Sequence, residues 1–390
     1  MRPAIGGWAS ANLDLIRGLA AIAVLAGHTR GLFFIPYHEL STHNPLLAAF
    51  YRCTSLGHQA VIVFFVLSGF LIVSSTTNAF ARGDWSWVKY LVNRTTRLSV
   101  VLVPSLLVCL AADQAGMALR ATAPLYQRPV AYLFATSVAS LETLRTFCGN
   151  LFYLQEILVP TFGSNGPLWS LSYEFWYYAL FPLLLCAIVS RFRPAARIGY
   201  LVAAFVVAWF VGHTIAMYFL IWMLGGAVAL LRRFNPRPAR VTRASAISVL
   251  LFMSVLAFGD GLPIGSAFVK DLLVATAFAL WVYFIVKSDK RAAGSFRTKC
   301  SHTLAGFSYT LYAVHFPLLF LARAFLIGNQ LWLPDAIHIL YACAIAIACT
   351  TAAYGLAQVT ELKTAALRGK VMSALRVHAP KQPEPEVVSY

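Results

Sequence analysis

An arginine and a histidine, Arg17 and His28, enclose ten small or apolar residues in the stretch RGLAAIAVLAGH. A guanidinium group binds anions such as phosphate, and an imidazole exchanges protons near neutral pH. On an α-helix, this spacing gives a rise of about 16 Å and a rotation of roughly 20° past three full turns. We therefore expect both side chains on one helix face at different depths, with Asp14 pairing with Arg17 one turn before it.

Further polar side chains lie inside other apolar stretches. Glu174, in NGPLWSLSYEFWYYALFP, has about the same depth as His28 by helical rise. A buried carboxylate needs a partner, so a pair between these two residues is expected. Ser68, Tyr309 and His315 lie in GHQAVIVFFVLSGFLI and SYTLYAVHFP. A histidine with a carboxylate and hydroxyl groups nearby suits proton transfer or nucleophilic catalysis.

The motif NRTTRL places Arg94 and Arg97 one helical turn apart at the inner edge of an apolar stretch. Together with Arg17 they predict a cationic pocket at the cytoplasmic face. Each polar residue also has a structural explanation. Arginines at such edges reach lipid phosphates, a lone histidine commonly bonds a neighbouring helix, and Ser68 beside Gly69 suits small-residue packing. The chemical interpretation therefore depends on these residues occurring together.

The surrounding chain is too apolar for a soluble protein. Of its 390 residues, 59% are hydrophobic and 12% are charged, and the mean hydropathy is +0.71. Apolar runs of about twenty residues recur along the whole length, as in polytopic α-helical membrane proteins. The seven cysteines are scattered without a CxxC pair, so neither a disulfide framework nor a metal site is predicted.

The predicted fold is an all-α transmembrane bundle of about ten spans with both termini in the cytoplasm. The fifth and sixth spans are short and poorly separated around Gly212. The transmembrane domain should cover 1–358, and the polar tail over 359–390 should be cytoplasmic and largely disordered. The long segment 120–166 is expected to hold a re-entrant or interfacial helix around 147–159. The spans are 13–35, 56–77, 98–119, 167–190, 197–212, 214–231, 244–260, 266–287, 304–327 and 336–358.

The net charge of +17 raises the question of a nucleic-acid partner, but its distribution argues against one. Most of the 31 Lys and Arg residues fall in alternate connections and in the tail. The other connections are nearly free of them, apart from the segment 120–166. This pattern is the positive-inside rule, which places the basic connections in the cytoplasm. The expected surroundings are therefore a lipid bilayer, with no nucleic acid.

Five segments in this order resemble the acyltransferase-3 family of integral membrane acyltransferases. They span residues 13 to 317 and read LDLIRGLAAIAVLAGH, GHQAVIVFFVLSGFLI, NRTTRL, NGPLWSLSYEFWYYALFP and SYTLYAVHFP. The family includes O-acetyltransferases of lipopolysaccharide O-antigen, exopolysaccharide and nodulation factors. One departure is Val100, where the family often has proline three residues after the position of Arg97. Some members carry a C-terminal esterase-like domain, which is not expected here.

The resemblance implies a multi-pass enzyme of the bacterial cytoplasmic (inner) membrane. It would transfer an acyl group, commonly acetyl, from acetyl-CoA or another acyl-CoA to a hydroxyl of a glycan or lipid-linked sugar. It implies no metal. Combined with the depths, and with the suitability of aromatic rings for sugar stacking, it assigns catalysis to His28 and Glu174, donor binding to Arg17, Arg94, Arg97, Ser68 and Tyr309, and acceptor binding to His315 and Trp169.

Two routes are open for His28, which could deprotonate the acceptor hydroxyl or be acylated itself and pass the group on. Glu174 would orient the imidazole, as a carboxylate does in a triad. The main alternative function is a transporter or flippase for a glycan or lipid, which would share the spans and the buried polar residues. A third is a non-catalytic membrane sensor. The sequence has no pair of matching hydrophobic halves of the kind that inverted-repeat transporters show.

Overall fold

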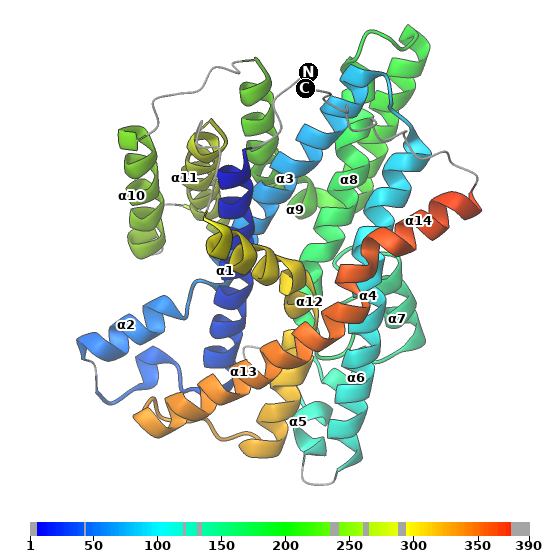
Figure 1. Ribbon diagram of the computed structural model, residues 1–390. Coiled ribbons are helices and arrows are strands. Elements are labelled where there is room, and N and C mark those ends of the chain that lie inside the picture. Colours follow the sequence, from blue (N-terminus) through cyan, green and yellow to red (C-terminus); the bar gives the residue numbers. More distant parts are fainter. Residues whose placement is uncertain are drawn as a thin grey trace.

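A computed structural model of the chain describes residues 6–42, 44–119, 122–130, 135–234, 242–259, 265–287 and 294–375. Within these ranges the chain is helical, with two isolated β-bridges and no β-strand. Eight of the described helices are long and apolar enough to cross a membrane. They form a bundle in which α1 packs along α12, and α3 packs against α9 (Figure 1). The predicted all-α polytopic bundle is confirmed.

The long helices are α1 (Gly7–Phe33), α3 (Gly57–Arg82), α4 (Trp87–Ala118), α8 (Trp169–Ile188), α9 (Pro194–Phe234), α11 (Ala267–Lys287), α12 (Ser295–Leu326) and α13 (Ala336–Val359). A shorter apolar helix is α10 (Thr242–Phe258). The connections and the tail hold α2 (Pro45–Cys53), α5 (Ala123–Gln127), α6 (Val138–Leu141), α7 (Leu144–Leu151) and α14 (Thr364–Ala374). Three-residue 3-10 helices are η1 (Tyr37–Glu39), η2 (Gly166–Leu168) and η4 (Glu361–Lys363).

The ten predicted spans correspond to these helices with differences at their ends. The fifth and sixth spans are the two halves of α9, which meet at a kink at Gly212, where φ is +82°. Glycine adopts this left-handed backbone without the steric penalty of a Cβ atom. Both α4 and α12 begin well before the predicted starts at 98 and 304. Their polar first turns, including NRTTRL, are helical too, and a hydropathy pattern marks only the apolar part.

Two irregular regions differ from expectation. Between α4 and α8, the predicted helix around 147–159 is only partly present, because α7 ends at Leu151 and turns follow it. The tail, predicted to be disordered from 359, begins with η4 and α14. The helix α14 is ordered because it packs against α4 (Figure 1). The predicted disordered stretch APKQPEPE lies outside the described residues.

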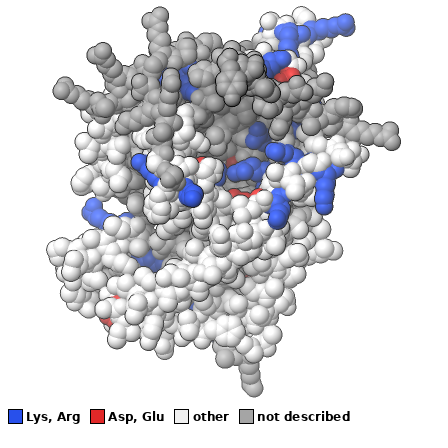
Figure 2. Space-filling view, viewed as in Figure 1, with Lys and Arg blue, Asp and Glu red and all other residues white. Residues whose placement is uncertain are grey.

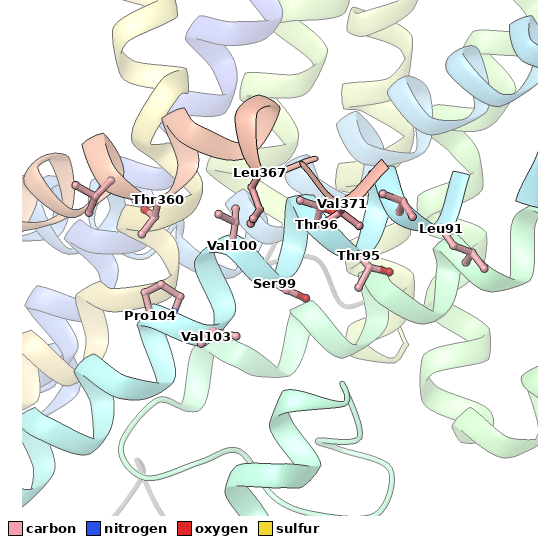
Figure 3. A pocket seen from close by; sticks show the side chains of 12 residues that line it. Leu91, Thr95, Thr96, Ser99, Val100, Val103, Pro104, Thr360, Leu367 and Val371 are labelled. Atoms are coloured by element: carbon pink, nitrogen blue, oxygen red, sulfur yellow. The ribbon is translucent and has the colours of Figure 1, made fainter. Parts of the chain in front are cut away.

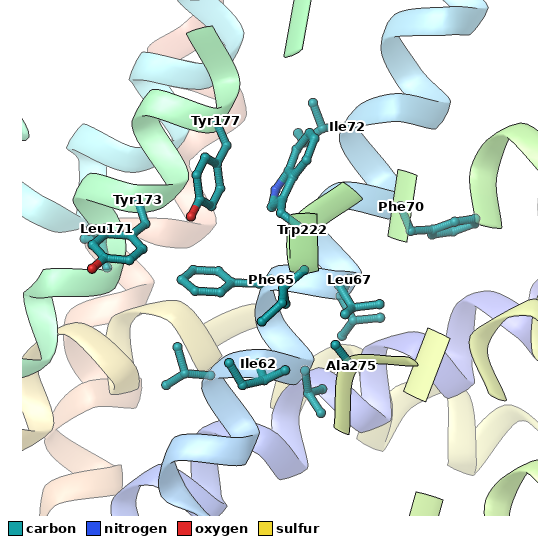
Figure 4. Close-up of a cluster of buried hydrophobic side chains, with 14 of the residues drawn as sticks. Ile62, Phe65, Leu67, Phe70, Ile72, Leu171, Tyr173, Tyr177, Trp222 and Ala275 are labelled. Carbon is teal, nitrogen blue, oxygen red and sulfur yellow. The ribbon is translucent and has the colours of Figure 1, made fainter. Parts of the chain in front are cut away.

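The backbones of α3 and the second half of α9 approach each other directly. A Cβ atom on Gly225 would collide with the carbonyl oxygen of Val66, and one on Gly69 would collide with that of Trp222. Small residues allow such an approach in membranes, where van der Waals packing drives helix association. An aromatic cluster from α3, α8 and α9 fills the space beside this contact, with the ring centroids of Tyr177 and Trp222 6.0 Å apart (Figure 4).

Prolines inside α8 and α12 leave backbone carbonyls without their helical donors, because proline has no N–H. In α12, Pro317 frees the carbonyl of Ala313, which accepts a hydrogen bond from Asn165 Nδ2 at 2.8 Å. The proline inside α8 frees the carbonyl of Tyr178, which accepts from the Tyr90 hydroxyl at 2.8 Å. Side chains of other elements thus replace both missing donors. The first bond fixes the connection before α8 against α12, and the second joins α4 to α8.

This connection is also anchored on a buried carboxylate, Asp113 of α4. Asp113 accepts hydrogen bonds from the Ser164 N–H at 2.7 Å and from its hydroxyl at 2.6 Å. Gly163 has φ +56°, and a Cβ atom there would collide with Asp113 and lie 3.4 Å from Glu142 Oε1. The two carboxyl groups are therefore close. Burial and the charge of Asp113 raise the pKa of Glu142 to about 7, against a hydrogen bond from Gln114 that lowers it.

The substitution Gly225→Ala is expected to destabilise the protein, because the added methyl group would collide with the backbone of α3. Overpacking of this kind costs ~1–3 kcal/mol, so the Tm of the detergent-solubilised protein should fall by several degrees. The matched control is Gly199→Ala on the same helix, since nothing lies within 4 Å of its Cβ position. Equal Tm values for both variants would contradict the close α3–α9 contact.

The raised pKa of Glu142 predicts a pH dependence of stability. The folded state holds this proton more tightly than the unfolded state does. The stabilisation is therefore complete below the ordinary pKa of 4.5 and is lost as the pH rises through about 7. The Tm should fall between about pH 4.5 and about pH 7 and level off above that, and Glu142→Gln, which cannot ionise, should reduce that fall. Glu39→Gln, at an exposed carboxylate, should leave it unchanged. An identical pH profile for Glu142→Gln and wild type would contradict this assignment.

Candidate functional site

A cavity of about 480 Å³ lies between α1, α3, α4, α8 and α12, with α14 at its rim. Its lining along α3 runs from Val61 to Ser75, about 21 Å of helix rise. Figure 2 shows Lys and Arg side chains gathered around a hollow in one face of the molecule, with acidic groups deeper inside it. We call this the basic end of the cavity, and its cationic lining residues are Arg17, Arg94, Arg97 and Arg368.

Most of the predicted site residues line this single cavity, although they come from five helices. Those that line it are Arg17, Ser68, Arg94, Arg97, Glu174 and Tyr309. The exceptions are His28, His315 and Trp169, which do not contribute to the lining. The structure thus separates the predicted residues into a cavity set, a histidine pair, and Trp169, which belongs to neither.

Arg17 is held between α1 and α12. Its Nη2 donates to the carbonyl of Ala305 at 2.9 Å and lies 3.7 Å from the Asp14 carboxylate, so the predicted ion pair is present. The Nε atom of Arg17 is buried and has no partner among the described residues. A buried donor without a partner is uncommon in folded proteins, and a bound anion is one way to satisfy it.

Arg94 and Arg97 point into the cavity from α4. Arg94 Nη2 donates to Ser75 Oγ at 2.9 Å, and its guanidinium lies over the rings of Tyr90 and Tyr178 at 5.5 and 5.9 Å. Arg97 has no hydrogen bond or ion pair within the part of the chain that the structure describes. The basic end therefore offers oriented guanidinium groups with unused donors, an arrangement suited to phosphate.

The predicted pair between His28 and Glu174 is wrong. Glu174 Oε1 accepts hydrogen bonds from the Ser68 hydroxyl at 2.7 Å and from the Tyr178 hydroxyl. Ser68 accepts in turn from Trp222 Nε1 at 3.2 Å. Matching depths on two helices do not determine which faces meet, and Glu174 faces α3 rather than α1. Its Oε2 has no hydrogen bond among the described residues, and Glu174 is one of the residues that line the cavity.

His28 pairs instead with His315 of α12. Its Nδ1 lies 2.6 Å from His315 Nε2, and the two rings are stacked with centroids 4.9 Å apart. The Nδ1 of His315 faces the carbonyl oxygens of Tyr312 at 2.8 Å and Leu311 at 3.1 Å. A carbonyl only accepts, so this Nδ1 carries a hydrogen and neutral His315 accepts at Nε2. His28 then donates from Nδ1, which leaves the lone pair of its Nε2 free.

The sequence spacing predicts that Arg17 and His28 share a helix face, and both indeed bond to α12. Arg17 contacts Ala305 and His28 contacts His315, ten residues further along the same helix. Because α1 packs on α12 over this length, one helix pair positions both Arg17 and the histidine pair. The contact explains why polar residues recur on α1 at this spacing.

Tyr312, which was not predicted as a site residue, connects the histidine pair with the cavity. Its ring lines the cavity, and its backbone carbonyl accepts from His315. Its hydroxyl bonds Ser170 Oγ at 2.6 Å and donates to the carbonyl of Pro167 at 2.8 Å. The signal in the sequence is the position of Tyr312 three residues before His315, on the same helix face.

Two further predictions concern ligands. Trp169, predicted to bind the acceptor, takes part in packing, with its ring edge-on to those of Tyr173 at 4.9 Å and Phe65 at 6.0 Å. No group of three or more His, Cys, Asp or Glu side chains that could hold a metal ion is found in the described ranges.

Comparison with known proteins agrees with these motifs. The acyltransferase-3 family, described as an acyltransferase domain, matches residues 10–357. Nodulation protein 10 of Rhizobium leguminosarum bv. viciae is 28% identical over 197 residues, which are 50% of this chain and 48% of that protein. The chain thus matches about half the length of this relative. No solved structure is significantly similar to the chain. Since the family match includes all five motifs and nearly the whole chain, the protein belongs to the acyltransferase-3 family of membrane acyltransferases.

Proposed function

We propose that this protein is an O-acyltransferase of the bacterial inner membrane that moves an acyl group, commonly acetyl, from acyl-CoA to a hydroxyl of a glycan or glycolipid. The observation that supports it best is the combination along α1 and α12 of a cationic cavity with a histidine whose Nε2 lone pair is free. Neither feature alone indicates acyl transfer. Together they suit a donor that is anionic at one end and reactive at the other.

In this proposal the basic end of the cavity faces the cytoplasm, as the positive-inside rule predicts for the basic connections. The phosphates of the donor cannot enter hydrocarbon, so they bind Arg17, Arg94 and Arg97. The pantetheine arm extends along the cavity toward the histidine pair. Midway, the free Oε2 of Glu174 can accept a hydrogen bond from an amide of that arm, which replaces its predicted role as the partner of His28.

The chemical step uses the free lone pair of His28. The acceptor hydroxyl gives its proton to His28 Nε2 as its oxygen attacks the thioester carbonyl. The C–S bond then breaks, and the proton passes to the departing thiolate of coenzyme A. His315 holds the imidazole in the productive tautomer through the Nδ1–Nε2 contact of 2.6 Å, the task that a carboxylate has in a serine-protease triad. If His28 is acylated first, the same lone pair attacks the thioester.

The acceptor is proposed from the family resemblance, since the members named above act on glycans. A sugar hydroxyl has an ordinary alcohol's low acidity, so it needs the general base that His28 can supply. The transporter or flippase and the sensor are the competing functions. Neither requires a thioester to be consumed, so release of free coenzyme A separates them from the enzyme.

The experiment uses the purified protein in lipid vesicles with acetyl-CoA and extracted cell-envelope glycans, and measures acceptor-dependent release of free coenzyme A with a thiol reagent. His28→Ala should lower the rate roughly 10²–10⁴-fold, the usual contribution of a general base, or abolish it. His338→Ala, at a histidine of α13 outside the cavity, is the matched control and should be fully active. Full activity of His28→Ala at equal protein levels would overturn the mechanism.

The role of His315 is tested by a pair of variants. His315→Leu removes the acceptor for His28 Nδ1, so the ring loses its fixed tautomer and kcat should fall on the order of 10²-fold or more. The KM for acetyl-CoA should stay unchanged, because His315 does not line the cavity. His315→Gln, whose Oε1 can accept in place of Nε2, should recover part of kcat. A rise in KM without a fall in kcat would instead assign His315 to substrate binding, as the sequence predicts.

A further inference from the structure

The chain returns to the cavity after its last long helix. Thr364 and Arg368, four residues apart on α14, line the same cavity as Arg17, Arg94 and Arg97. Residues four apart lie on one face of a helix, so both side chains are presented to the cavity together. The basic end therefore contains a fourth guanidinium group, and it comes from a segment that the sequence predicts to be a disordered tail.

A buried contact fixes the start of this segment against α12. Glu361 of η4 accepts hydrogen bonds from the N–H of Thr310 at 2.9 Å and from its hydroxyl at 3.0 Å. Thr310 follows Tyr309, which lines the cavity. The segment is thus held directly beside the cavity wall, only a few residues before Arg368.

Packing also fixes the rotation of α14. Leu367 and Val371 lie in an apolar groove of about 660 Å³ whose other wall is α4, with Leu91 and Val100 among its residues (Figure 3). The face that carries Thr364 and Arg368 is adjacent to this one. A rotation of α14 about its axis would take Leu367 and Val371 out of the groove on α4 and at the same time move Arg368 away from the cavity. The position of Arg368 at the basic end therefore follows from packing.

Arg368 is exposed and has no hydrogen bond or ion pair among the residues that the structure describes. Its donors are available to a ligand. Coenzyme A carries a diphosphate and a separate phosphomonoester, and the latter alone has a charge of about −1.5 to −2 at neutral pH. Several guanidinium groups spread around one opening suit an anion with its charge in two places better than a single cluster does.

We propose that Arg368 is a specificity residue of the donor site, and that α14 lies across its opening so that this guanidinium binds a phosphate of the nucleotide part. This inference rests on the proposed function in taking acyl-CoA as the donor. It goes further because it assigns α14, which follows α13, to the donor-binding site. It requires that Arg368 contributes to the binding of the nucleotide phosphates and not to the acyl or pantetheine part.

The test compares acetyl-CoA with acetyl-pantetheine, which has the thioester and the arm but no nucleotide phosphates. Arg368→Ala should raise the KM for acetyl-CoA about 10-fold with kcat unchanged, as expected for one lost charge-assisted contact. With acetyl-pantetheine, variant and wild type should have equal KM. Arg368→Lys should recover part of the affinity. Lys370→Ala, two residues away and outside the cavity lining, is the matched control and should behave as wild type.

Calorimetric binding of coenzyme A itself needs no turnover and keeps the two proposals distinguishable. Wild type that binds coenzyme A but releases none from acetyl-CoA would contradict the proposed function, while a weaker Kd for Arg368→Ala would still support the inference. Equal Kd for the variant and wild type would overturn it. So would an equal loss with acetyl-CoA and acetyl-pantetheine, because that result would mean α14 acts by shaping the cavity. Wild type that binds no coenzyme A would overturn both.

Discussion

A polar group inside an apolar bundle must find its hydrogen-bond partner within the protein, because lipid offers none. In this chain the contact between α1 and α12 supplies such partners. Arg17 donates a hydrogen bond to a backbone carbonyl of α12, and His28 donates one to the ring of His315. These two bonds fix the rotation of one helix on the other and set the distance between cation and base. The further walls of the cavity come from α3, α4 and α8, with α14 at its rim.

The same requirement explains how the irregular segment before α8 becomes part of the site. Pro317 leaves a carbonyl of α12 without a donor, and Asn165 supplies one. Asp113 holds Ser164 next to it, and the Tyr312 hydroxyl reaches the carbonyl of Pro167. Three helices are thereby joined through one short loop. The loop thus holds the hydroxyl of Tyr312, and the backbone carbonyl of the same residue accepts the hydrogen bond from His315. The geometry of the histidine pair therefore depends on a segment remote in sequence.

The sequence predicts those features that helix periodicity controls. The spans and the shared face of Arg17 and His28 depend only on rise and rotation within one helix, and both are observed. The partner of Glu174 depends on the rotation of separate helices about their own axes, which one sequence does not encode locally, and that prediction is wrong. The helix α14 is short and polar, so nothing in its hydropathy reveals the groove on α4 that orders it.

The proposed function places opposite demands on the two ends of one ligand. Phosphate groups are too strongly hydrated to leave the aqueous edge, whereas the thioester must reach a base held deep among apolar helices. A single helix can satisfy both demands only if its cation and its base share a face and are separated by about the length of the connecting arm. The rise between Arg17 and His28 is about 16 Å, and the cavity extends about 21 Å along α3. The distance is thus built into α1, and a one-residue insertion between the two residues would rotate His28 by about 100° away from His315.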